Sequence, residues 1–359
     1  MFGDERFMSL ALRLARRGLG NVYPNPAVGC VIVRNKVVVG RGCTGVGGRP
    51  HAEVVALEQA RGAADGGTAY VTLEPCCHER VTGPCTAALI QAGIKRAVIG
   101  VLDPDPRVSG KGVEILKKAG IHVKYGVMIR ECEELNAGFF NSKTLARPLI
   151  TVKLATTLDG KISFGPQEKE RWITNDLTRR WIHRQRAMYD AIMVGSNTVL
   201  CDDPMLDCRL PGLSQYSPVR VVIDRTGKLK QRHKVVQTSN LIPTYVIVES
   251  TSKCDLEGVK YVKVNAGEQF LHDAMCALSS ELGITRLFVE GGSILVTELL
   301  KKRLVDRLIW TRAGKLSGTV GTDSILDIGN NGAGGYKLIK TDSMSFHDDT
   351  ADIFRVVYG

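Results

Sequence analysis

His51-Ala52-Glu53 and the later stretch EPCCHERVTGPC, residues 74–85, decide how this chain is interpreted. They supply one imidazole, at His51, and two well-spaced thiols, at Cys76 and Cys85. Zinc in a catalytic site typically takes three protein ligands and leaves the fourth position to water, and an imidazole with two thiolates suits this metal. The residues therefore predict a site for Zn2+.

A carboxylate lies two residues after the histidine, at Glu53. The apolar positions that follow predict a helix with His51 and Glu53 on its first turn, where both can face one pocket. Cys76 follows an apolar run over residues 69–73 that predicts a strand. Zinc would provide hydroxide near neutral pH, and Glu53 would carry protons to a departing amine. This is the chemistry of the nucleobase deaminases.

A purely structural zinc site is the alternative. It needs a fourth ligand, for which His78 or Cys77 is available. The deaminase signature H-x-E…P-C-x-x-C also differs in spacing, because the second ligand cysteine here lies nine positions after the first. A structural site leaves Glu53 unexplained, and for this reason we favour the catalytic interpretation.

Length and composition bound the remaining possibilities. At 359 residues, 44% of them hydrophobic, the chain is long enough for two or three domains with a core in each. It has no apolar run of about eighteen residues and no signal-peptide core, so we expect a cytoplasmic protein without a membrane partner. The formal charge of +11 favours anionic partners, but the basic residues do not cluster. We therefore expect small phosphorylated molecules as binding partners, and we do not expect nucleic acid.

Ten cysteines in a long chain without an export signal favour free thiols and metal ligands over disulfides. Seven of them lie outside the 74–85 stretch and are expected to be small apolar fillers: Cys30, Cys43, Cys132, Cys201, Cys208, Cys254 and Cys276.

Hydrophobic periodicity predicts an α/β protein throughout. In the first half, helices are expected at residues 4–17, 86–92, 112–119 and 131–141, with strands at 28–33, 37–39, 69–73, 97–101 and 121–125. This alternation around a first hairpin implies a three-layer α/β sheet. Pro148 disfavours helix at the residue before it, so an extended segment should start there. We therefore place the boundary between two domains at residues 142–148. Beyond it, strands are expected at 149–154, 191–194, 220–223, 245–248, 261–264 and 287–289, and helices at 176–187, 270–282 and 294–302. Thr174 or Asn175 should cap the first of these helices.

The last of these strands runs into Glu290-Gly291-Gly292-Ser293, which opens the next helix. Such a junction offers free backbone N–H groups and the positive end of a helix dipole to a phosphate. It is not a G-x-G-x-x-G fingerprint, so a Rossmann domain is not supported.

The first half resembles the deaminase part of the bifunctional riboflavin biosynthesis deaminase-reductase family. The resemblance lies in residues 24–31, 50–53, 72–76 and 84–85. It implies a cytidine-deaminase-like fold and the functional residues His51, Cys76 and Cys85 as zinc ligands, Glu53 as the proton shuttle, and Asn25 and His78 as substrate contacts. The chain departs from the family loop at Cys77, usually a serine, and at Gly83, usually a proline.

The second half is similar to the reductase part of the same family, in residues 153–161, 172–174, 186–187, 190–192, 195–206 and 290–292. This implies a dihydrofolate-reductase-like fold that uses NADPH. The implied cofactor contacts are Thr156, Trp172, Thr198, Asp202, Gly291, Gly292 and Ser293. The implied substrate contacts are Lys153, Arg186, Leu206, Arg209 and Glu290. Glu170 stands where the family usually has a serine.

Arg225 is a further candidate. It follows the strand expected at 220–223, and in reductases of this fold the loop after the corresponding strand often meets the adenosine 2′-phosphate. A guanidinium is a planar, permanently charged donor suited to that dianion.

Together these features predict a zinc-dependent pyrimidine deaminase domain over residues 1–146 and an NADPH-dependent reductase domain over 147–359. The implied reactions are deamination of a 2,5-diamino-6-ribosylaminopyrimidinone 5′-phosphate and reduction of its ribosyl to a ribityl chain. A homo-oligomer is expected. The alternatives are a deaminase with an inactive, structural reductase half and an RNA-editing deaminase, whose RNA binding would show a steep salt dependence.

Overall fold

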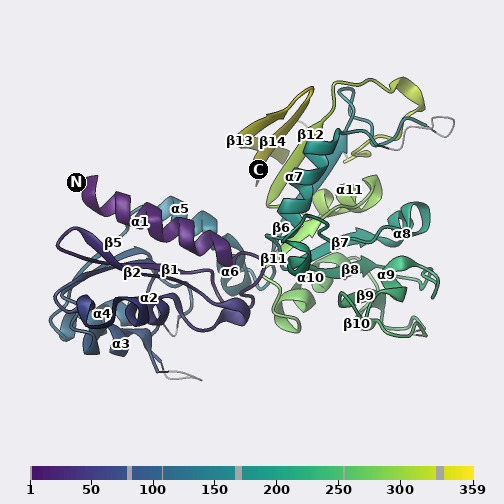
Figure 1. Cartoon of the computed structure of the whole chain (residues 1–359). Helices are drawn as coiled ribbons and strands as arrows, with labels where there is room; N and C mark the ends of the chain where they lie inside the picture. The colour runs from purple at the N-terminus through teal and green to yellow at the C-terminus, as the bar shows by residue number, and fades with distance from the viewer. Residues whose placement is uncertain (1, 79–82, 107, 166–171, 254, 329–334) are drawn as a thin grey trace. The chain divides into compact units, whose positions relative to one another are not determined.

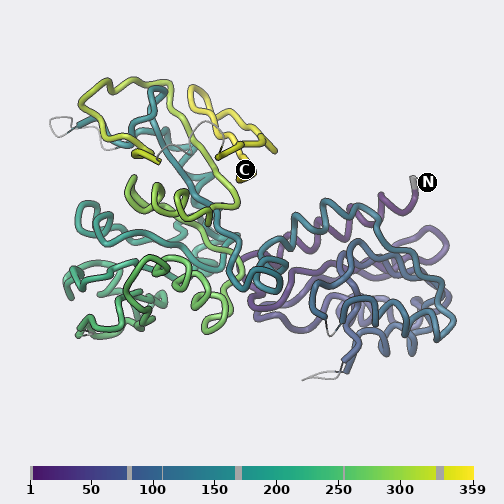
Figure 2. Tube along the Cα trace, turned by 180° about the vertical axis from the view of Figure 1, so that it is seen from behind, coloured from purple at the N-terminus to yellow at the C-terminus, as the bar shows by residue number. Residues whose placement is uncertain are grey.

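The computed structural model describes residues 2–78, 83–106, 108–165, 172–253, 255–328 and 335–359. The chain divides into two compact units, Met1–Ala146 and Arg147–Gly359. Figure 1 labels most of the helices and strands of each unit, and Figure 2 follows the same chain as a trace from behind.

The first unit is built on a five-stranded sheet with the order β2-β1-β3-β4-β5. Its strands are β1 (Gly29–Arg34), β2 (Val37–Cys43), β3 (Thr68–Leu73), β4 (Arg96–Val101) and β5 (His122–Tyr125). β1 pairs antiparallel with β2 and β3, whereas β3, β4 and β5 are parallel. Asn35 and Lys36 both have positive φ, which is the geometry of a tight hairpin turn between β1 and β2. The parallel strands β3 and β4 end at the same edge, where Glu74 and Asp103 follow them.

Helices cover both faces of this sheet (Figure 1). α1 (Phe2–Ala15) and α5 (Ile129–Leu135) lie on one face, and α2 (Ala52–Ala60), α3 (Cys85–Gln91) and α4 (Lys111–Lys118) lie on the other. Gly42 in β2 allows α2 to approach closely, because a Cβ at this position would overlap the carbonyl oxygen of Ala52. The start of α2, which carries His51 and Glu53, is thereby held against the sheet.

One predicted helix is wrong in extent. Residues 131–141 were expected to form a single helix, but the structure has two, α5 and α6 (Ala137–Thr144), which meet at Asn136. The helical backbone is interrupted at Asn136, and the Asn136 side chain bonds the backbone of Ala27. It accepts from the Ala27 N–H at 2.9 Å and donates to the Ala27 carbonyl at 3.0 Å. This contact joins residues 109 positions apart, and it fixes the loop that contains Asn25.

The second unit has a nine-stranded sheet with the order β10-β9-β8-β7-β11-β6-β12-β14-β13. Seven strands are parallel: β6 (Leu149–Thr156), β7 (Ala191–Gly195), β8 (Val219–Ile223), β9 (Thr244–Glu249), β10 (Lys260–Val264), β11 (Arg286–Val289) and β12 (Arg307–Arg312). The antiparallel hairpin β13 (Tyr336–Phe346) and β14 (Asp349–Tyr358) extends the sheet beyond β12. The strands β12, β13 and β14 were not predicted from the sequence.

Residues that alternate along each strand fill two cores, one on each face of the sheet. In β7, Met193 packs with α10 (Phe270–Ser280) and α11 (Ser293–Lys301), while Ile192 and Val194 pack on the other side with α7 (Asp176–Arg186) and α9 (Lys234–Gln237). A short helix, α8 (Ser196–Asp202), follows β7 and was also not predicted.

Two smaller expectations have clear outcomes. Asn175 caps α7 by accepting a hydrogen bond from the Thr178 N–H. Cys30, Cys132 and Cys208 are buried fillers, but Cys201 is exposed on α8, so the filler interpretation is wrong there. Cys254 lies outside the described residues. None of the described helices has the length and apolarity needed to cross a membrane.

Candidate functional sites

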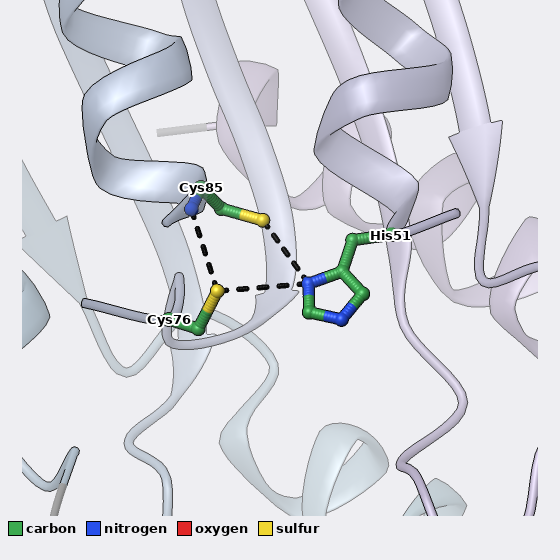
Figure 3. A group of neighbouring side chains, drawn as sticks. All are labelled: His51, Cys76 and Cys85. Atoms are coloured by element: carbon green, nitrogen blue, oxygen red, sulfur yellow. Dashed lines mark hydrogen bonds between the residues drawn. The ribbon is translucent and has the colours of Figure 1, made fainter. Parts of the chain in front are cut away.

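Three side chains from separate elements converge on one point in the first unit (Figure 3). His51 is the residue just before α2, Cys85 is the first residue of α3, and Cys76 lies in the loop after β3. The metal-binding atoms of the three residues all lie within 4.8 Å of one another. Among the described residues this is the one such group of histidine, cysteine and acidic side chains, and it includes neither Cys77 nor His78.

The spacing of these atoms fits zinc. The Nδ1 atom of His51 lies 3.2 Å from the Cys85 Sγ atom and 3.6 Å from the Cys76 Sγ atom. Tetrahedral zinc with ordinary Zn–N and Zn–S bonds sets such atoms about 3.5 Å apart. Hydrogen bonds from the Cys85 thiol and from His51 lower the pKa of Cys76 to about 4, so one thiolate is already favoured here.

Glu53 is the carboxylate beside this group. It lies in the first turn of α2 and is buried, with only 3% of its surface exposed. Burial, followed by the charge of Cys76, raises the pKa of Glu53 to about 7. A carboxyl group with this pKa can both take up and release a proton near neutral pH, as a proton shuttle must.

A cavity of about 160 Å3 opens onto the metal-binding group. His51, Glu53 and Cys76 line it, and so do the two expected substrate contacts, Asn25 and His78. The buried Nδ1 atom of His78 has no hydrogen-bond partner in the part of the chain that the structure describes.

Further residues of this cavity were missed from the sequence. Asp103, Asp105, Arg49, Lys143 and Glu74 also line it. Asp103 lies two residues after β4, at the end of the sheet from which Cys76 also emerges, and this shared end was the signal that could have identified it. Burial raises the pKa of Asp103 to about 6.

In the second unit, three expected substrate residues come together. Val289 of β11 pairs with Val152 of β6, so Glu290 emerges beside Lys153. The Lys153 ammonium lies 3.5 Å from Glu290 Oε2. Arg186, near the end of α7, donates from Nε to Glu290 Oε1 at 2.5 Å and from a terminal nitrogen to Oε2 at 3.1 Å.

The same cluster continues through Asp207 and His183, which were not identified from the sequence, to the predicted Arg209. Arg186 also donates to the Asp207 carbonyl at 2.8 Å, and His183 Nδ1 lies 3.1 Å from the same oxygen. The side chain of Arg209 is largely exposed. Its backbone nitrogen lies 3.3 Å from His183 Nδ1, and a terminal guanidinium nitrogen lies 3.4 Å from His183 Nε2. His183 stands three residues before Arg186 on α7, a helical spacing that could have identified it. Leu206 of the same segment is buried in the core.

The expected cofactor residues fall into two groups. Gly292 caps α11, and the position of a Cβ on it would lie 3.7 Å from the Thr198 hydroxyl, so α8 and the glycine junction adjoin. The Ser293 hydroxyl is bonded to the Asp323 carbonyl. The second group consists of Thr156, Trp172 and Asp202. Thr156 is buried and accepts a hydrogen bond from Trp310, Trp172 is half exposed, and Asp202 is exposed at the end of α8.

Arg225 lies in the turn after β8, and β7 separates that strand from β11. Its guanidinium bonds Glu249 Oε1 through two nitrogens, at 2.9 and 2.5 Å, and lies 4.8 Å from the centre of the Phe270 ring. Half of the side chain is exposed. Gly291 packs against Leu295. Glu170 lies outside the described residues.

Two family models match the chain. The cytidine and deoxycytidylate deaminase zinc-binding region matches residues 1–101, which include all three convergent ligands and Glu53. The RibD C-terminal domain matches residues 148–351, which is more than half of the chain. Each model falls within one of the two structural units.

Relatives of known identity match along most of their length. The riboflavin biosynthesis protein RibD of Aquifex aeolicus is 42% identical over 316 residues, covering 88% of each chain. The protein of the same name from Escherichia coli K12 is 40% identical over 331 residues, covering 88% of this chain and 89% of that one.

Solved structures agree with the whole chain. Acinetobacter baumannii RibD superimposes with a TM-score of 0.89 at 33% identity, covering 99% of both chains. A diaminohydroxyphosphoribosylaminopyrimidine deaminase/5-amino-6-(5-phosphoribosylamino)uracil reductase from Thermotoga maritima gives a TM-score of 0.87 at 34% identity, covering 98% of both. These matches confirm the α/β fold class and the family resemblance of both halves.

Proposed function

This chain belongs to the RibD family of riboflavin biosynthesis proteins, and we propose that each of its two units carries one of the two activities of that family. The chain is a bifunctional deaminase and reductase that uses zinc and NADPH. Residues 1–146 would perform the deamination and residues 147–359 the reduction. Two successive reactions on one small molecule require two chemically distinct sites, and each unit offers one.

The proposed first reaction is hydrolysis of the amine from a 2,5-diamino-6-ribosylaminopyrimidinone 5′-phosphate. His51, Cys76 and Cys85 would hold the zinc ion, which when bound activates water at neutral pH. Glu53 would take a proton on its carboxylate and deliver it to the nitrogen of the leaving amine. Asn25 and His78 would orient the pyrimidine from the cavity wall, since both line it.

The proposed second reaction reduces the ribosyl chain of the product to a ribityl chain, with NADPH supplying the hydride. Lys153, Arg186 and Glu290 would orient the sugar, and the largely exposed Arg209 would face the phosphate end. Leu206 is buried in the core, so it would support this site from behind without touching the phosphate. Gly291, Gly292 and Ser293 at the start of α11, with Thr198 on α8, would face the cofactor phosphates. Thr156, Trp172 and Asp202 would complete the cofactor site, and Arg225 would meet the adenosine 2′-phosphate.

The observation that carries this proposal is the convergence of His51, Cys76 and Cys85 beside Glu53 in one cavity, within a chain that matches RibD proteins over almost its full length. A structural zinc site does not account for the buried carboxylate. Neither a degenerate reductase half nor an RNA-editing enzyme is favoured, because the Lys153–Arg186–Glu290 cluster is intact and the whole-length relatives are RibD proteins.

The test is made on the purified full chain. Supplied with the diaminopyrimidine nucleotide, it should release ammonia without NADPH, and it should oxidise NADPH only once the deaminated product has formed. A zinc chelator should stop ammonia release but leave reduction of the ready-made deaminated substrate intact. Ammonia release that requires NADPH, or no release at all, would contradict the proposal.

We further infer a homo-oligomer in the cytoplasm. Among the described strands, β13 is an edge of the nine-stranded sheet, and an exposed edge of 11 residues can pair with another copy. Light scattering after gel filtration should give a mass above the 39.1 kDa of one chain.

A further inference from the structure

We propose that Glu74 is a positioning residue of the deaminase centre, which clamps one wall of the substrate cavity to the strand end that carries Cys76. The inference rests on the proposed deaminase function and adds to it a residue that controls substrate affinity without binding the metal or moving a proton.

The Glu74 carboxylate is fully engaged by backbone donors. Its Oε2 atom accepts from the N–H groups of Asp103 at 3.2 Å and Gly110 at 2.9 Å, and its Oε1 atom accepts from the N–H of Val113 at 3.1 Å. The residue is buried, with 3% of its surface exposed. A carboxylate held in this way is not placed to collect a proton from a substrate, whereas Glu53 beside the metal ligands is. The two buried glutamates of the cavity therefore have different tasks.

The three donors come from both ends of one segment. Asp103 stands just after β4, and Gly110 and Val113 are the cap and the third residue of α4. A helix leaves its first N–H groups without partners and carries partial positive charge at this end, so a carboxylate there is stabilising. Glu74 therefore bonds both Asp103, after β4, and the start of α4, and so holds these two ends of the connection close together.

That loop forms a wall of the cavity. Asp103, Asp105 and Val108 all line it, together with Glu74 itself. The Asp103 carboxylate accepts from the Asp105 N–H at 2.8 Å, so the described part of the wall is braced internally as well. The position of the wall as a whole then depends on Glu74.

The base of the clamp is rigid. Glu74 directly follows β3, and its own N–H donates to the Val101 carbonyl of β4 at 2.9 Å. The start of α4 also packs directly on this backbone, since a Cβ at Gly112 would overlap the Pro75 carbonyl oxygen. The wall is therefore set relative to Pro75, which precedes the zinc ligand Cys76.

The metal ligands have their own supports. The Cys76 Sγ atom accepts from the Cys85 N–H at 3.3 Å, and the Cys76 carbonyl accepts from the Thr86 N–H at 3.2 Å. His51 is held by α2. Loosening the clamp should thus displace the wall and leave the zinc site assembled.

The experiment uses Glu74→Gln in the full chain. The amide keeps the shape of the side chain but turns one acceptor oxygen into an NH2 group that faces backbone N–H donors. We expect the KM of ammonia release to rise about tenfold or more, with kcat within a few-fold of wild type. Zinc content should stay at the wild-type level. The reductase activity of the same chain should be unchanged, and it calibrates the concentration of folded protein.

Two further variants make the result decisive. Glu114→Gln removes an exposed carboxylate from α4 and should leave every constant unchanged. Glu74→Asp keeps the charge but is one methylene shorter, and it should give an intermediate KM. Loss of zinc or of folding in both Glu74 variants would assign the residue to the fold and overturn the proposal. A fall in kcat alone, or wild-type kinetics, would overturn it as well. Failure of the proposed function is a separate outcome, because it would appear as absent ammonia release in the wild type.

Discussion

Arg186 and Glu290 form a paired contact across 104 positions of sequence, with guanidinium nitrogens at 2.5 and 3.1 Å from the two carboxylate oxygens. Lys153 adds a second cation, 3.5 Å from Oε2. Burial by itself would raise the pKa of Glu290, but Arg186 and Lys153 lower it to about 2. Glu290 is therefore ionised throughout the physiological range.

Glu290→Gln should destabilise the second unit and impair reduction. Removing one partner of a buried ion pair leaves the other charge uncompensated and costs about 3–5 kcal/mol. Because the pKa of Glu290 is lowered in the folded state, this contribution is present above its ordinary value of 4.5 and is lost as pH falls toward 2. Urea unfolding at pH 7 measures the loss. Glu298→Gln is the control, because this partly exposed glutamate of α11 makes only a surface ion pair with Lys301, and such pairs contribute little. Equal stability of the two variants would contradict the prediction.

Glu53→Gln should keep zinc and abolish deamination. His51, Cys76 and Cys85 remain in place, but the amide cannot carry a proton, and general acid–base catalysis is typically worth about a hundredfold to ten-thousandfold in rate. Ammonia release and metal content are measured on the same sample. Loss of zinc from the variant, or ammonia release near the wild-type rate, would remove Glu53 from the role of shuttle.

A fragment that ends at Ala146 should release ammonia without NADPH. The chain divides there into two compact units, and every residue of the proposed zinc site lies in the first. Circular dichroism and metal analysis establish that the fragment is folded and zinc-loaded. If it is folded and loaded but inactive, the second unit contributes to the first site.

Much of this fold could be predicted because most of its elements are local. The strand before Cys76, the helix that starts after His51 and the cap at Asn175 follow from neighbouring residues. The interruption at Asn136 is different, because the side chain there bonds Ala27, 109 positions away in the sequence. Neighbouring residues do not indicate such a contact. The β13–β14 hairpin was missed for a related reason: β13 is mostly exposed and lacks a buried face that would give a clear pattern.

The zinc ligands were found because their chemistry is strict in residue type and spacing. The wall residues Asp103 and Asp105 carry no such signature, and only the parallel pairing of β3 with β4 brings them beside Cys76. His183 is likewise defined by contacts with Arg209 and the Asp207 carbonyl, which become neighbours only in the folded chain. Residues of this kind depend on tertiary structure, so the sequence carries only indirect signals for them: the strand that ends before Asp103, and the helical spacing between His183 and Arg186.

Asp103→Asn should stabilise the zinc-free first unit, increasingly so as pH rises. Burial raises the pKa of Asp103 from 3.8 to about 6, so its contribution to stability is full below pH 3.8 and is lost as pH rises through 6. Neutralisation removes a cost of up to about 3 kcal/mol at pH 8. The amide oxygen can still accept from the Asp105 N–H. Thermal unfolding with a chelator at pH 5 and pH 8 tests this, and a pH-independent difference would refute it.

Arg225→Ala should weaken NADPH selectively. The guanidinium lies over Phe270 and bonds Glu249, an arrangement that orients its remaining donors while half of the side chain stays exposed. A charge-assisted contact to a 2′-phosphate is worth about 1.5–3 kcal/mol, which corresponds to roughly a ten- to hundredfold loss for NADPH and almost none for NADH. The measurement is reductase kcat/KM with each cofactor. Glu249→Gln is the matched control: it removes the charge that partners Arg225 but leaves the arginine, so the preference for NADPH should persist. If the ratio of kcat/KM for NADPH to kcat/KM for NADH is unchanged in Arg225→Ala, Arg225 only stabilises the turn after β8 through Glu249. Another group would then bind the 2′-phosphate.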